Sequence, residues 1–151
     1  MSGAIPIAGY ASLFRVPDLA RDVVAPGAFA RSLDQRARPP VKMLYQHDPK
    51  APVGVWDSVV EDGRGLFVRG QIIEAIAAGR YAASLVRAGV LDGLSIGFQT
   101  RAARPDPTGT LRILTEIALW EVSLVSFPML PGARFRVVPP SSDRGRPARV
   151  A

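Results

Sequence analysis

The sequence predicts one α+β domain whose mostly antiparallel sheet curls or closes into a barrel, flanked by a few helices. Its 151 residues suffice for one domain with a hydrophobic core, and 48% apolar with 21% charged residues is ordinary globular composition. Several segments alternate apolar and polar residues with the period of a strand, and turns rich in Gly and Pro separate them. Closing the sheet would remove exposed strand edges.

The N-terminal part of the chain contains a predicted strand and a predicted short helix. Residues 5–14 alternate with period two, as a strand does. A helix is predicted over residues 26–33, because Pro26 suits a first helical turn and because Phe29 and Leu33 share one helical face.

Three more strands are predicted in the next segment. Residues 41–46 form a strand that places His47 at its end, and Asp48-Pro49 then turns the chain. Strands at about 53–60 and 65–72 flank an Asp-Gly pair, which is a strong hairpin signal, so these two strands should pair antiparallel.

The second half of the domain contains the longest predicted helix and a long pair of strands. Apolar residues recur at near-helical spacing over about 72–88, with Gly79 as an interruption and Gly89 as a C-terminal cap. A turn then leads into a strand over 94–100, and the return strand covers about 110–127.

Composition excludes several classes of site. The chain has no cysteine, which excludes disulfides, a thiolate nucleophile and Cys-ligated metals. Its single histidine excludes a multi-His metal centre, and no cofactor or metal is expected. There is no apolar run of about 18 residues and no basic start typical of a secretory signal, so a cytoplasmic protein without a membrane span is expected.

The positive charge is most concentrated at the C-terminus. The net charge is +6, and we place the domain at residues 1–138 and a basic tail at 139–151. The tail combines Pro, Ser and Arg with few apolar residues, so disorder is expected there. One hypothesis is that Arg144, Arg146 and Arg149 recruit an acidic scaffold or nucleic acid; another is that self-cleavage removes the tail.

Three side chains are candidates for chemistry, and each also has an ordinary structural interpretation. His47 is the only imidazole available as a base, or else a surface histidine. Ser95 is a candidate nucleophile, or a polar residue on a half-buried strand. Glu121 stands in an apolar run, where it is either a buried partner of an imidazolium or a solvent-facing strand residue. Gly97 would leave room for a substrate backbone, or would mark a bend.

Five sequence motifs, taken together, resemble the prohead proteases of tailed phages. In chain order they are GYASLF (9–14), DVV before PGAF (22–29), YQHD (45–48), GLSIGF (93–98) and WEVSLVSFP (120–128). The resemblance covers roughly residues 8–135, with the motifs in the family's order.

This resemblance implies a serine endopeptidase enclosed in an immature capsid within the bacterial cytoplasm. The expected substrate is a scaffold protein or the major capsid protein, which would be cleaved in its N-terminal scaffold-like region. Enzymes of this family often also cleave themselves, and a homo-oligomer is expected. The family is similar in fold to the herpesvirus assembly proteases, whose curled barrel is surrounded by helices. Such genes also occur in prophages and gene transfer agents.

The same resemblance assigns roles to individual residues. Ser95 of GLSIGF is the expected nucleophile and His47 of YQHD the expected base. The herpesvirus relatives use a second histidine as third member, and this chain has none, so an acid is expected: Glu121 of WEVSLV, with Asp48 as the alternative. Backbone N–H groups or an arginine such as Arg134 are candidates for the oxyanion donors.

Two other functions compete with this one. A capsid assembly or scaffold component could keep the fold and lack activity. A nucleic-acid-binding β-barrel is suggested by the charge of +6 and by three aromatic side chains able to stack on bases, Trp56, Phe67 and Trp120.

Overall fold

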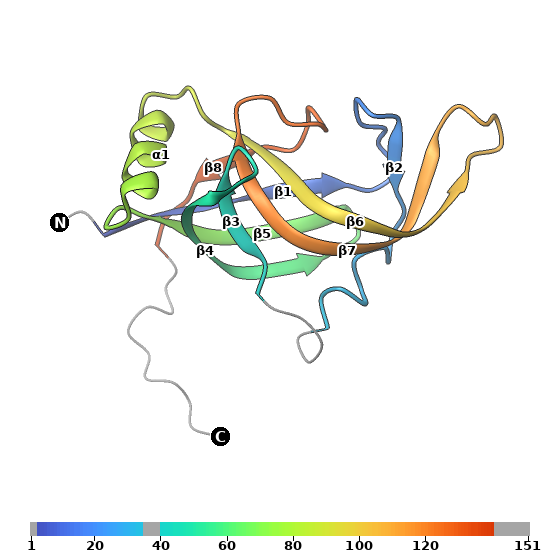
Figure 1. Ribbon diagram of the computed structural model, residues 1–151, viewed down its shortest axis with the longest axis horizontal. Coiled ribbons are helices and arrows are strands. Elements are labelled where there is room, and N and C mark those ends of the chain that lie inside the picture. The colour runs from blue at the N-terminus through green and yellow to red at the C-terminus, as the bar shows by residue number, and fades with distance from the viewer. Residues whose placement is uncertain (1–2, 35–39, 141–151) are drawn as a thin grey trace, which may run out of the picture.

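The computed structural model describes residues 3–34 and 40–140, in which one helix lies at the end of a curled, eight-stranded half-barrel sheet (Figure 1). The elements in chain order are β1 (Ala4–Leu13), β2 (Asp22–Val24), β3 (Lys42–Tyr45), β4 (Asp48–Glu61), β5 (Gly65–Ile73), α1 (Ala77–Arg87), β6 (Gly93–Pro105), β7 (Arg112–Val125) and β8 (Phe135–Val137). The predicted mostly-β architecture with few helices is therefore confirmed.

The sheet is mixed, so the prediction of an antiparallel sheet was partly wrong. Its strand order is β2-β7-β3-β4-β5-β1-β8, with β6 on the other edge of β7. Strands β2 and β3 both pair parallel with β7, whereas β6 pairs antiparallel with it along most of its length. Parallel partners need long connections, which local turn signals do not reveal. Strand β7 therefore joins its hairpin partner β6 to β2 and β3, two segments that are distant in sequence.

The predicted hairpin is confirmed as β4–β5, which pair antiparallel with Val59 opposite Val68. Its turn is held by Asp62, whose Oδ1 accepts the N–H groups of Arg64 at 2.8 Å and Gly65 at 3.0 Å. The turn predicted at Asp48-Pro49 was misplaced by two residues. The chain reverses at Gln46-His47, and Asp48 is already the first residue of β4.

Helix α1 is shorter than predicted, because the segment before Ala77 completes β5 and a turn. Gly89 ends the helix with φ +74°, and the N–H groups of Gly89 and Val90 bond back to Val86 and Leu85, as a Schellman cap requires. Gly79 does not interrupt the helix. It lets the helix approach the sheet, since a Cβ there would lie 2.8 Å from the Val53 carbonyl oxygen.

The helix predicted over residues 26–33 was wrong, because this segment is a series of turns. Gly27 has φ +88°, which a right-handed helix cannot contain, and the N–H of Phe29 donates to Glu61 Oε1 at 2.8 Å instead of to a carbonyl one turn back. Phe29 is nevertheless fully buried.

The hydrophobic core lies inside the curl of the sheet and under α1. Its largest fully buried side chains include Ile7, Phe29, Met43, Leu66, Leu94 and Leu124. Within residues 3–34 and 40–140, no helix is both long and apolar enough to cross a membrane. The proposed tail arginines, at positions 144, 146 and 149, lie outside the described residues.

Candidate active site

His47 lies in a two-residue turn between β3 and β4, which pairs Tyr45 with Asp48. Gln46 has φ +52° and His47 has φ +60°. Turns of this kind normally use Gly, Asn or Asp, because a left-handed conformation costs other residues about 1–2 kcal/mol each. Contacts from the surroundings must therefore hold this turn in place.

Those contacts come from the end of β7 and the residue that follows it. The backbone N–H of Gln46 donates to the Leu124 carbonyl at 2.9 Å, and its side-chain Nε2 donates to Ser126 Oγ at 2.7 Å. The backbone N–H of His47 donates to Ser123 Oγ at 3.0 Å. The Ser126 N–H also donates to Gln46 Oε1 at 3.3 Å. Four hydrogen bonds thus fix the turn that carries the imidazole to the end of β7 and to Ser126.

Glu121 is the acidic partner of His47. It is only 8% exposed, and its two carboxylate oxygens are both engaged: Oε1 contacts His47 Nδ1, and Oε2 accepts the Ser123 hydroxyl. The solvent-facing interpretation of Glu121 is therefore wrong. Asp48 is exposed, and its Oδ1 instead accepts the N–H of Lys50 at 2.9 Å.

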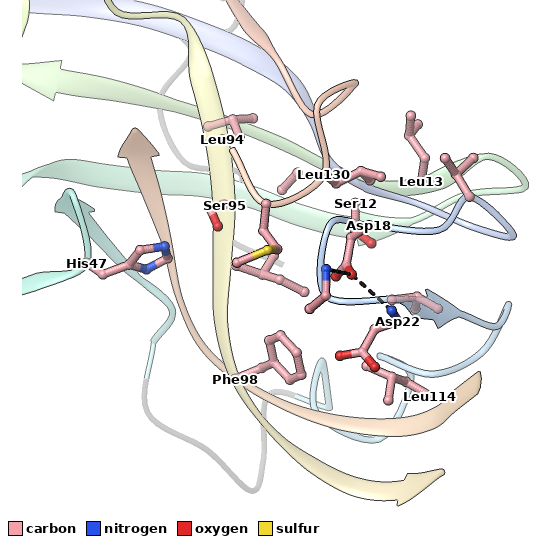
Figure 2. A pocket seen from close by; sticks show the side chains of 16 residues that line it. Ser12, Leu13, Asp18, Asp22, His47, Leu94, Ser95, Phe98, Leu114 and Leu130 are labelled. Atoms are coloured by element: carbon pink, nitrogen blue, oxygen red, sulfur yellow. Dashed lines mark hydrogen bonds between the residues drawn. The ribbon is translucent and has the colours of Figure 1, made fainter. Parts of the chain in front are cut away.

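Ser95 comes to the same place on β6, where it lies directly opposite Ser123 of β7. Ser95 is 7% exposed and faces a pocket that His47 also lines. In Figure 2 the imidazole points from its turn toward the strand that carries Ser95. The Ser95 hydroxyl makes no hydrogen bond with any other described residue, which leaves it available to a ligand. Catalytic hydrogen bonds often tighten only when substrate binds.

The electrostatics of the site favour a charged imidazole. The hydrogen bond to Glu121, and to a smaller extent the attraction of its charge, raises the pKa of His47 above the ordinary 6.5, although partial burial acts in the opposite direction. Because Nδ1 faces the carboxylate, Nε2 is the nitrogen left free to exchange a proton.

A pocket of about 220 Å³ opens beside Ser95 and His47 (Figure 2). Its wall is mainly apolar and includes Ala11, Leu13, Ile96, Phe98, Leu114 and Leu130. Two acids in the lining are already satisfied. Asp22 binds the Arg112 guanidinium at 2.9 and 3.0 Å, and Asp18 accepts the backbone N–H groups of Ala20 and Asp22. The pocket therefore suits an apolar side chain of a ligand placed against Ser95.

Gly97 makes room for the side chain of Glu121, whereas room for a substrate backbone was expected. It lies opposite Glu121 on β7, and a Cβ built on it would lie 2.7 Å from Glu121 Cδ. The missing side chain makes room for the carboxylate that contacts His47.

Replacing Gly97 with alanine is therefore expected to push Glu121 away from the imidazole. Forcing an extra carbon into this site should destabilise the fold by about 1–3 kcal/mol and lower the pKa of His47. Urea unfolding and NMR titration of the single histidine measure the two effects. Gly63→Ala is the matched control, because a Cβ there meets nothing within 4 Å. Equal unfolding free energies and unchanged histidine titration in G97A would refute this role.

Sequence reasoning did not single out Ser123, which contacts both Glu121 and the His47 backbone. The available signal was the two-residue spacing of Glu121 and Ser123 within an apolar run, which places two polar groups on one buried face. The guanidinium of Arg134, a candidate oxyanion donor, donates hydrogen bonds to Asp92 Oδ1 at 2.7 Å and to the Pro131 carbonyl at 3.0 Å.

Solved structures of two viral proteases are similar in fold. The bacteriophage T4 capsid assembly protease superposes with a TM-score of 0.67 and 17% sequence identity, covering 80% of each chain. The protease of Kaposi's sarcoma-associated herpesvirus, in complex with a hexapeptide phosphonate inhibitor, superposes with a TM-score of 0.60 and 18% identity, covering 87% of this chain and 64% of the other. The herpesvirus-protease-like fold expected from the resemblance is confirmed.

Two curated prohead proteases are similar in sequence. The protein of Enterobacteria phage HK97 is 39% identical over 126 residues, and that of Escherichia phage T5 is 30% identical over 137 residues. These alignments cover 80% and 89% of this chain, which spans 54% and 63% of the length of the two relatives. The family model described as caudovirus prohead serine protease matches residues 2–145. The chain therefore belongs to the caudovirus prohead serine protease family.

Proposed function

We propose that the protein is a serine endopeptidase that cleaves a capsid or scaffold protein inside the immature procapsid. The observation that carries the proposal is that His47 contacts buried Glu121 and lines one pocket with Ser95, whose hydroxyl bonds to no other described residue. A serine nucleophile needs a base, and the base needs a group that orients and charges it. The family relationship supports the same reaction class.

In the proposed reaction, His47 Nε2 takes the hydroxyl proton of Ser95 while Oγ bonds to a peptide carbonyl carbon. The peptide C–N bond then breaks, and His47 returns the proton to the leaving amine. Water next gives a proton to His47 and attacks the acyl ester, whose C–O bond breaks as Ser95 regains its proton. Glu121 holds the ring in one tautomer and stabilises its charged form.

The proposed substrate is the N-terminal scaffold-like region of the major capsid protein, or a separate scaffold protein. The prohead proteases of phages HK97 and T5 support this choice of substrate class. The apolar wall of the pocket favours a substrate with an apolar side chain near the bond that is cut.

Coexpression with the cognate major capsid protein tests the function. The expected result is a shortened capsid protein, with one discrete cut mapped by mass spectrometry. An uncut capsid protein in assembled procapsids that contain the folded chain would overturn the proposal in favour of an inactive assembly component.

A base with a raised pKa predicts a characteristic pH dependence. His47 must be neutral to accept a proton, so kcat/KM should rise with pH through a midpoint above 6.5. The stability that the His47–Glu121 ion pair contributes changes in the opposite direction. It is fully present below pH 6.5 and is lost as the pH rises through the raised pKa of His47. Peptide cleavage and NMR titration of the one histidine should give the same midpoint. A midpoint at or below 6.5 would contradict the assigned role of Glu121.

A further inference from the structure

Ser123 occupies a position that connects all parts of the proposed site. It is fully buried on β7, two residues after Glu121, and lies opposite Ser95 across the β6–β7 pair. Its hydroxyl donates to Glu121 Oε2 and accepts the backbone N–H of His47 at 3.0 Å. One small side chain therefore touches the acid and the turn that carries the base.

The direction of these bonds is determined by chemistry. A backbone N–H can only donate, so the His47 amide must occupy a lone pair of Ser123 Oγ. The hydroxyl proton is then free to point at Glu121, which accepts hydrogen bonds when ionised. With Oε1 on the imidazole and Oε2 on Ser123, the buried carboxylate has a partner on each oxygen. Such charge-assisted bonds are the stronger kind.

The hydrogen bond from the His47 amide to Ser123 matters because it holds a strained turn in place. Gln46 and His47 both have positive φ values, which their residue types disfavour. The other bonds that join the turn to Leu124 and Ser126 are made by Gln46, so the bond to Ser123 is the one that fixes the backbone of His47 itself.

We propose that Ser123 is a positioning residue, which aligns Glu121 with His47 by bonding to the carboxylate and to the histidine backbone together. It acts through these two groups, and it forms no hydrogen bond with Ser95 among the described residues. The proposal rests on the proposed peptidase function, but its effect on the imidazole can be measured without any cleavage.

The test uses Ser123→Ala in the full chain, alone and combined with Glu121→Gln. Loss of a bond to a charged group should lower kcat by roughly 10- to 100-fold with little change in KM. It should also lower the pKa of His47, because the carboxylate is no longer held against the ring. Since part of the effect of Ser123 passes through Glu121, the same substitution should lower kcat by a smaller factor when Glu121 is already glutamine.

Two further variants separate positioning from folding. Ser123→Thr keeps the hydroxyl and should restore most of kcat and the raised pKa of His47. Ser32→Ala is the matched control, because Ser32 Oγ accepts the Leu119 N–H of the same strand at 2.8 Å without touching the site. It should leave the histidine titration unchanged.

Two outcomes would overturn the positioning role: a His47 pKa in S123A that is unchanged or higher, or an equal loss of kcat in both backgrounds. If the wild-type protein cleaves nothing, the NMR titrations still decide the role of Ser123, while the failed cleavage counts against the peptidase function alone.

Discussion

Replacing Ser95 with alanine is expected to abolish cleavage of the capsid or scaffold substrate. The hydroxyl supplies the nucleophile, and loss of such a group lowers kcat by on the order of 10⁶-fold in serine proteases. Because the hydroxyl bonds to no described residue, its removal should leave the free energy of unfolding within about 0.5 kcal/mol of wild type. Capsid-protein size after coexpression and urea unfolding of the purified chain measure the two effects.

Ser12→Ala provides the control for this experiment. Ser12 is 3% exposed and lines the same pocket, so it matches Ser95 in burial and location. The S12A variant should retain cleavage. Cleavage retained by S95A, or lost equally in both variants, would show that Ser95 is not the nucleophile.

Replacing Glu121 with glutamine should lower kcat by on the order of 10²- to 10⁴-fold, since the ring would lose the charge that orients it and stabilises its protonated form. The pKa of His47 should fall, because the hydrogen bond and charge that raise it are weakened while the effect of burial remains. The acid limb of the kcat/KM profile should move to lower pH by the same amount.

Two matched variants make the result specific. Glu116 lies on the same strand and pairs with Arg31 at the surface, so Glu116→Gln should leave activity and histidine titration unchanged. Asp48→Asn tests the alternative acid and should have little effect on kcat. A loss in D48N with none in E121Q would reverse the assignment.

Local sequence signals predicted the parts of the fold that depend on neighbouring residues. The Asp-Gly turn of β4–β5 and the Gly89 cap are examples, since each follows from backbone geometry over a few residues. The parallel pairing of β2 and β3 with β7 was not predictable in this way, because its partners are up to 90 residues apart.

The site was predictable only in part for the same reason. His47, Ser95 and Glu121 were selected by residue type and motif, but the burial of Glu121 depends on β6 and β7 meeting with Gly97 opposite the carboxylate. The left-handed turn at His47 was also hidden, because Gln46-His47 lacks the residues that normally signal it. The long-range hydrogen bond from His47 to Ser123 stabilises this turn in place of local sequence preferences.

The most direct test of the account is to label the folded protein with a serine-reactive phosphonate and locate the adduct by mass spectrometry. Trypsin should release residues 88–101, in which Ser95 is the only serine. The assignment of Ser95 as nucleophile and His47 as base predicts a single adduct on this peptide, formed at a rate that rises with the deprotonation of His47 and is lost in His47→Ala. An adduct on another serine, or labelling of Ser95 that is unaffected by H47A, would contradict it.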